Sequence, residues 1–216
     1  MKKNILSLAL LSSLFMFTSC DSNENNDTTS EEVKVVKNCI YSYNEANTEL
    51  NWTAYKFLSK AGVGGTFKTI NVEGELSGSN PKAIIESINF NIPINSVETQ
   101  DDSRNKKIQT FFFGSLENSD LLSGEIVSLN DDGMAIFKIK MNNIEKEIKG
   151  EYTLNDNHFK FATAINVNDW NASVGIDALN EECKDLHTDY ENGDTESKLW
   201  PDVDILLDMK LTKNCD

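Results

Sequence analysis

Apolar and polar residues alternate along many short segments of this chain, and this alternation limits the folds that it can adopt. In one such segment, Leu50, Trp52 and Ala54 are separated by polar neighbours. A period of two places alternate side chains on one face of an extended strand, so each segment predicts a half-buried β-strand. The pattern recurs at residues 88–94, 135–141, 148–154, 159–165 and 203–211, and more weakly at residues 66–76 and 124–129.

Turn-forming residues separate these eight predicted strands. They are Gly62 with Gly64 and Gly65, and the segments 78–81, 130–133 and 155–157. Short links of Gly, Asn and Asp allow tight reversals, which predicts antiparallel hairpins. Strands with one apolar face must close on themselves or stack, so an all-β barrel or sandwich is expected.

Two segments interrupt the strand pattern. Residues 101–109 predict a short helix capped by Asp102 or Ser103. Apolar residues then recur at helical spacing in an acidic stretch, at Ile176, Leu179, Cys183 and Leu186. We therefore expect one or two short helical inserts between strands.

The first nineteen residues have the layout of a secretory signal peptide. Lys2 and Lys3 precede an apolar run at residues 5–17 that is too short to span a membrane, and Cys20 follows at the expected cleavage point. A cysteine there can carry the acyl chains that anchor a bacterial lipoprotein. Residues 21–32 are polar and acidic and predict a disordered tether. The remaining domain, residues 33–216, is thus expected in the cell envelope, anchored to the outer membrane through Cys20.

The formal net charge of −15 limits the partners of this chain. Such a charge repels phosphate backbones and anionic headgroups, so no nucleic-acid partner is expected and membrane contact should come from the lipid anchor. The Cys and His residues have no metal-ligand spacing, so no metal and no cofactor are expected. His158 and His187 have no Ser or Cys partner at a diagnostic spacing, so the chain is not expected to be an enzyme.

Three stretches, in this order along the chain, resemble the YceI-like family. Residues 50–67, LNWTAYKFLSKAGVGGTF, contain a Trp, a Lys and a V-x-G-x-F run. Residues 88–116 contain Thr99, Arg104 and the aromatic pair Phe112 and Phe113, and residues 165–171 read INVNDWN. The resemblance covers nearly the whole domain.

This resemblance implies a single eight-stranded, lipocalin-like antiparallel barrel that encloses a long isoprenoid or another amphiphilic lipid. The sequence departs from the family pattern at Asn105, where Asp is common, and in an acidic insert at residues 180–201. The insert precedes the last strand, so it bears on the mouth of the barrel and on the identity of the ligand.

The resemblance also implies that inward-facing apolar side chains line a tunnel for the lipid. The expected lining residues are Trp52, Ala54, Phe67, Ile88, Phe90, Ile92, Phe137, Ile139, Phe161 and Ile165, with Phe111, Phe112 and Phe113 at the entrance. An eight-stranded barrel is wide enough to hold one small ligand or to be filled by side chains. The same residues would then form an ordinary core, and both interpretations stay open.

After Cys20, three cysteines remain in an oxidising compartment, where disulfides persist. In a closed barrel of even strand number the first and last strands are neighbours. Cys39 precedes the first strand and Cys215 follows the last, so these two are expected to pair and to clip the termini together. Cys183 is then left over, unless the insert folds back to Cys39.

Two functions from different classes follow. The first is a lipid-anchored carrier or sink for an isoprenoid-like lipid. The alternative is a surface interaction module with a packed barrel, in which the acidic insert meets a protein or a cation. Residues 189–196 are rich in oxygen ligands but lack the order of a calcium loop, which favours a solvated acidic loop. Association of two barrels as a homodimer is left open.

Overall fold

The computed structural model describes residues 38–216. The expected signal peptide, Cys20 and the tether at residues 21–32 lie outside the described residues, so these assignments stay predictions. In the described part of the chain, no helix is both long and apolar enough to cross a membrane.

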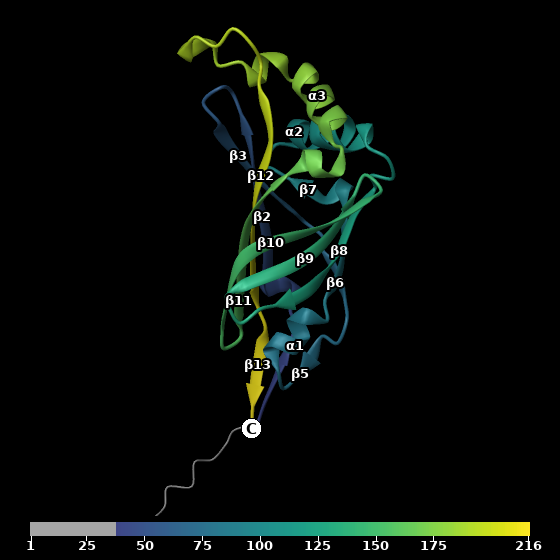
Figure 1. Ribbon diagram of the computed structural model, residues 1–216, viewed down its shortest axis with the longest axis vertical. Coiled ribbons are helices and arrows are strands. Elements are labelled where there is room, and N and C mark those ends of the chain that lie inside the picture. The colour runs from purple at the N-terminus through teal and green to yellow at the C-terminus, as the bar shows by residue number, and fades with distance from the viewer. Residues whose placement is uncertain (1–37) are drawn as a thin grey trace, which may run out of the picture. The chain divides into compact units, whose positions relative to one another are not determined.

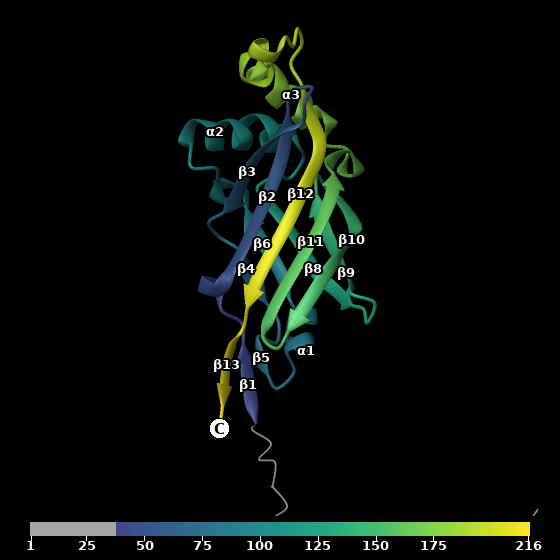
Figure 2. The ribbon, with the colours of Figure 1, turned by 90° about the vertical axis from the view of Figure 1, so that its left-hand side faces the viewer.

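Within residues 38–216, ten strands pair into one antiparallel sheet that curls into a half-barrel (Figures 1 and 2). In spatial order they are β4 (Asn71–Glu73), β6 (Asn89–Pro93), β8 (Leu121–Leu129), β9 (Met134–Met141), β10 (Ile144–Asn155), β11 (His158–Asn166), β12 (Leu199–Lys210), β2 (Thr48–Lys56), β3 (Ala61–Phe67) and β7 (Val97–Glu98). The strand β7 forms one edge of the sheet and β6 lies next to the other edge, and the short turn η2 (Ile94–Ser96) joins the two strands directly, which brings the two sides of the sheet together. The predicted all-β antiparallel fold is confirmed.

The first and last long strands are neighbours, as expected for a barrel. β12 pairs with β2, with Val203 opposite Ala54 and Ile205 opposite Trp52. β2 also pairs with β3, with Val63 opposite Ala54. These pairings place Val63, Ala54 and Val203 in one row across three strands, with their side chains on the same face of the sheet.

A second sheet holds the two ends of the described chain together. Among residues 38–216 it contains three strands in the order β13 (Thr212–Cys215), β1 (Cys39–Ser42) and β5 (Ser77–Gly78). Cys39 lies opposite Cys215 in this sheet, and the two form a disulfide across 176 residues of sequence. The predicted pairing is confirmed, and Cys183 is a buried free thiol.

The predicted number of eight strands is too low. The expected strand at residues 66–76 is divided between β3 and β4, and β1, β5, β7 and β13 have only two to four residues each. Such short segments complete at most two repeats of a period-two pattern, so alternation does not reveal them.

The three glycines that predicted a turn lie instead within β3. The chain reverses before them, at residues 57–60, where Phe57 and Lys60 have φ values of 64° and 56°. A left-handed conformation is unusual for side chains of this size, and the signal for this turn is therefore absent from the sequence.

The helices gather at the two ends of the barrel (Figure 1). One end carries α2 (Asp102–Lys107), its continuation η3 (Ile108–Phe112) and η4 (Phe113–Ser115), and α3 (Ser173–Glu182) followed by η6 (Lys184–His187). Both predicted helical inserts are confirmed, although α2 is capped by Asp101, whose side chain accepts from the Arg104 N–H at 3.0 Å. The other end carries α1 (Pro81–Glu86), where only a turn was expected. Further short turns are η1 (Glu45–Asn47), η5 (Val167–Trp170) and η7 (Tyr190–Asn192).

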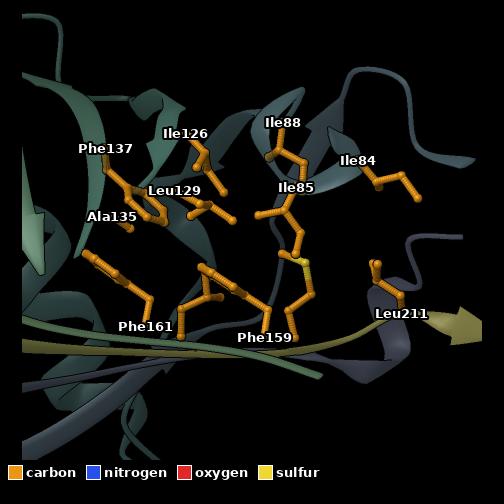
Figure 3. Packing of buried hydrophobic residues seen from close by; sticks show 12 residues of the cluster. Ile84, Ile85, Ile88, Ile126, Leu129, Ala135, Phe137, Phe159, Phe161 and Leu211 are labelled. Carbon is orange, nitrogen blue, oxygen red and sulfur yellow. The ribbon is translucent and has the colours of Figure 1, made fainter. Parts of the chain in front are cut away.

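The end of the barrel that carries α1 is filled with side chains. Ile84 and Ile85 of α1 belong to one cluster of buried residues with Phe159 and Phe161 of β11 and with Leu211 (Figure 3). Phe159 and Ile85 are fully buried, and the rings of Phe137 and Phe161 stack with centroids 4.2 Å apart. This core closes one end of the barrel, so any internal space must open toward α2 and α3.

Candidate functional site

A cavity of about 340 Å³ occupies the end of the barrel beneath α2 and α3. Its walls are the inner faces of β2, β3 and β12 and the apolar faces of the helices. Apolar residues in these walls include Trp52, Ala54, Val63, Phe67, Ile108, Phe112, Phe113, Ile165, Ile176, Leu179, Val203 and Ile205. The wall also includes exposed residues such as Leu186, which is 59% exposed, so the cavity reaches the surface there.

A second cavity, of about 130 Å³, continues toward the packed end and is lined almost entirely by apolar residues. The two cavities share five lining residues, namely Phe67, Leu122, Met141, Ile165 and Ile205. Along β2, Leu50 lines the smaller cavity and Trp52 and Ala54 line the larger one. The cavities therefore lie in series along the strands.

Aromatic rings lie flat against the barrel wall because glycines face them on the neighbouring strands. Gly65 is opposite Trp52, and a Cβ at this glycine would lie 2.2 Å from Cζ2 of the indole. Gly124 is opposite Phe90, and a Cβ there would lie 2.5 Å from Cζ of the ring. Each ring thus covers a glycine instead of crossing the interior, which leaves the centre of the barrel open.

The structure places twelve of the thirteen predicted lining and entrance residues around these two cavities. The larger cavity is lined by Trp52, Ala54, Phe67, Phe112, Phe113 and Ile165, and the smaller one by Ile88, Phe90, Ile92, Phe137, Ile139 and Phe161, together with Phe67 and Ile165. Their role in binding a ligand stays a prediction. Phe137 and Phe161 belong to the buried core and also border the smaller cavity, so the two interpretations do not exclude each other at these positions.

Phe111 is misplaced in the predicted entrance, because within residues 38–216 it lines neither cavity. The segment from Ile108 to Phe112 is one π-helical turn, and it directs Phe112 and Phe113 inward. These two rings form an edge-to-face pair with centroids 4.8 Å apart. Phe113 therefore lines the cavity, whereas Phe111 is only partly buried.

Charged and titratable side chains surround the mouth of the larger cavity. Lys56 at the end of β2, Arg104 and Lys107 on α2, and Cys183 and His187 after α3 all belong to its wall. The Lys56 ammonium donates to the carbonyl oxygen of Leu186 at 2.8 Å and lies 4.3 Å from the ring centroid of Phe57. This end of the cavity is therefore polar, while the interior is apolar.

The mouth keeps His187 and Cys183 uncharged near neutral pH. Burial, together with the nearby Lys56 and Lys107 ammonium groups, lowers the pKa of His187 to about 4. The imidazole Nδ1 lies 3.0 Å from the side-chain oxygen of Asn180 and donates to it. Burial also raises the pKa of the Cys183 thiol. In both groups, the low-polarity surroundings disfavour the charged form.

Lowering the pH from 7 to 5 should reduce the free energy of unfolding by about 2 kcal/mol through His187 alone. The ring stays neutral in the folded state until the pH approaches 4, whereas an unfolded His takes up a proton near pH 6.5. The contribution of His187 is therefore complete above about pH 6.5 and is lost as the pH falls toward 4. Urea unfolding at both pH values should show this loss in the wild type and a smaller one in His187→Gln, which can still donate to Asn180. Equal pH dependence in the two proteins would contradict the assignment.

The acidic insert forms part of this mouth. Leu186, His187, Leu199 and Trp200 all line the larger cavity. Backbone hydrogen bonds tie the insert to the β2–β3 turn, with the Phe57 N–H donating to the Lys198 carbonyl at 2.9 Å, and the Trp200 indole donates to the Phe57 carbonyl at 2.7 Å. The insert thus belongs to the cavity wall, and the barrel has internal space, which does not match the packed barrel of the alternative hypothesis.

Sequence reasoning missed several residues of the site. Val203 and Ile205 lie on a correctly predicted strand, and their alternation with Asp202 and Asp204 was a signal that they face inward. The helical spacing of Ile176 and Leu179 predicted a helix but not its place over the cavity. No local signal links these helices to the barrel mouth, because that contact is between segments far apart in the chain.

A curled antiparallel sheet around an apolar cavity with a charged mouth has the architecture of a lipocalin-like barrel for a hydrophobic ligand. Residues 41–211 match the YceI-like domain, and the chain belongs to this family. A search of the curated proteins found no match.

Solved structures share the fold at low sequence identity. A polyisoprenoid binding domain from Saccharophagus degradans, implicated in plant cell wall breakdown, aligns with a TM-score of 0.56 and 14% identity over 81% of this chain and 98% of that domain. Burkholderia cenocepacia BcnA aligns with a TM-score of 0.54 and 11% identity over 79% of this chain and 99% of its own. These similarities support the fold.

Proposed function

We propose that this chain holds an isoprenoid-like or other amphiphilic lipid inside its barrel, as a carrier or a sink in the bacterial cell envelope. The observation that carries the proposal is the pair of apolar cavities in series, closed at one end by the core and bordered by charged residues at the other. This shape fits an extended apolar tail with a polar head. The similar domain from Saccharophagus degradans is described as binding a polyisoprenoid, which supports the same ligand class.

Burial of apolar surface is sufficient to hold such a ligand. A tail that buries about 300 Å² gains about 7.5 kcal/mol at about 25 cal/mol per Å², before the costs of association are subtracted. Binding therefore requires no catalytic group and no cofactor, and the proposal includes no reaction.

The N-terminal segment supports a location at the membrane. The signal peptide, Cys20 and the polar tether have the layout of a bacterial lipoprotein, and anchoring in the outer membrane would place the barrel beside a source of lipid. Association of two barrels is not required by this proposal.

Native mass spectrometry of the full chain, purified from its own host, should detect about one prenyl or acyl lipid per barrel. The Cys20→Ser variant is the matched control, because it removes the covalent acyl chains of the anchor and should keep the lipid inside the barrel. A Cys20→Ser protein that is empty, and that takes up no added decaprenol, would overturn the proposed function.

A further inference from the structure

Three cationic side chains line the larger cavity in a protein that is otherwise strongly acidic. Lys56, Arg104 and Lys107 lie in its wall, although the chain as a whole has a net charge of −15. They come from two elements that are distant in sequence, the end of β2 and the helix α2. Within residues 38–216, Asp101 is the one carboxylate in the same wall, so the wall has a net charge of about +2.

These three charges are only partly neutralised by neighbouring acids. Among the residues that the structure describes, Lys56 forms no ion pair, and its ammonium contacts the Leu186 carbonyl and the Phe57 ring. Arg104 is 3.8 Å from Asp101, and Lys107 is 3.4 Å from a carboxylate oxygen of Glu182. The side chain of Lys107 is only 28% exposed, so water screens its charge incompletely. The mouth can therefore accept further negative charge.

The chemistry of this group favours a phosphate. Arginine and lysine donate to phosphate oxygens in short, charge-assisted hydrogen bonds, and a phosphate monoester carries nearly two negative charges at neutral pH. The three cations keep an excess of about +1 after Asp101 and Glu182 are counted, and a phosphate supplies the negative charge that this excess attracts. A hydroxyl or quinone headgroup would leave Lys56 without a charged partner, and Arg104 and Lys107 with only the carboxylates of Asp101 and Glu182.

We propose that the lipid bound by this barrel is a phosphate monoester, with its tail in the two apolar cavities and its headgroup bound by Lys56, Arg104 and Lys107. This inference rests on the proposed function and adds the chemical class of the headgroup. It divides the site into an apolar part that supplies most of the affinity and a cationic part that selects the ligand.

Farnesol and farnesyl phosphate test this division, because they have the same tail and differ in the headgroup. Trp52 and Trp200 line the cavity, so intrinsic fluorescence reports the binding of both. The wild-type full chain should bind farnesyl phosphate about tenfold more tightly than farnesol or better. In Lys56→Met/Arg104→Met this preference should fall to about twofold or less.

Lys149→Met is the matched control, since Lys149 is exposed on β10 beside the inward-facing Ile148 and should leave the preference intact. Equal binding of both probes by the wild type would overturn the headgroup inference and leave the proposed function standing. If the wild type binds neither farnesol nor farnesyl phosphate, the headgroup inference and the proposed function are both overturned. If the double variant keeps the preference for farnesyl phosphate, the assignment of the headgroup to Lys56 and Arg104 is overturned. If inorganic phosphate binds as tightly as farnesyl phosphate, the site is one for free phosphate and the headgroup inference is overturned.

Discussion

Replacing Ala54 with tryptophan should strongly weaken lipid binding while the barrel stays folded. Ala54 lies on the inner face of β2, between Val63 and Val203, and all three line the larger cavity. An indole at this position has empty space to enter, so it should occupy the volume that the lipid tail requires without displacing the surrounding strands. We expect the affinity for farnesol to fall by about tenfold or more, since several methylene groups lose their burial at about 0.8 kcal/mol each.

Ala164→Trp is the control for this change. Ala164 lies on β11, next to the cavity-lining Ile165, but it is exposed on the outer face. Native mass spectrometry should find bound lipid in Ala164→Trp and much less in Ala54→Trp, with similar thermal unfolding for both. If Ala54→Trp binds lipid as well as the wild type does, the tail lies elsewhere in the molecule.

Removing the disulfide should cost about 2–5 kcal/mol of unfolding free energy. The bond between Cys39 and Cys215 joins residues 176 apart, and in the chain-entropy model so long a loop restricts the unfolded chain strongly. The strands β1 and β13 are each only four residues long, so backbone pairing alone holds the ends weakly. Urea unfolding of Cys39→Ser/Cys215→Ser should therefore show a clearly lower midpoint than the wild type.

Cys183→Ala separates the effect of the bond from the effect of losing a cysteine, because Cys183 is a free, buried thiol. Its unfolding should remain sensitive to reductant, whereas the double serine variant should unfold at the same urea concentration with and without dithiothreitol. A double variant as stable as the oxidised wild type would show that the two short strands suffice to hold the termini.

The barrel could be predicted from the sequence because its long strands have one apolar face. The alternation around Trp52, Phe90 and Phe161 correctly indicated strands whose side chains face the interior. The disulfide followed from the same topology, since it requires only that the first and last strands are neighbours.

The open interior was not predictable from composition, because the same apolar residues suit a core and a cavity. The difference depends on glycines: Gly65 was interpreted as a turn residue, yet it lets the Trp52 ring lie against the wall. The residues at the mouth of the larger cavity could not be predicted from local sequence patterns either. A π-helical turn directs Phe113 and not Phe111 toward the interior. Only the tertiary fold brings Lys56 of β2 and Arg104 of α2 into the same cavity wall.

Because the two cavities lie in series, their combined depth limits the length of lipid tail that the barrel can bury. A short tail fills only the outer compartment of about 340 Å³, and a longer one must pass between Phe67, Leu122 and Met141 to reach the inner compartment of about 130 Å³. The core around Phe159 then stops it. With the headgroup held at the mouth, affinity should rise with each added isoprene unit until the inner compartment is full, and then level off, because further carbons find no room inside.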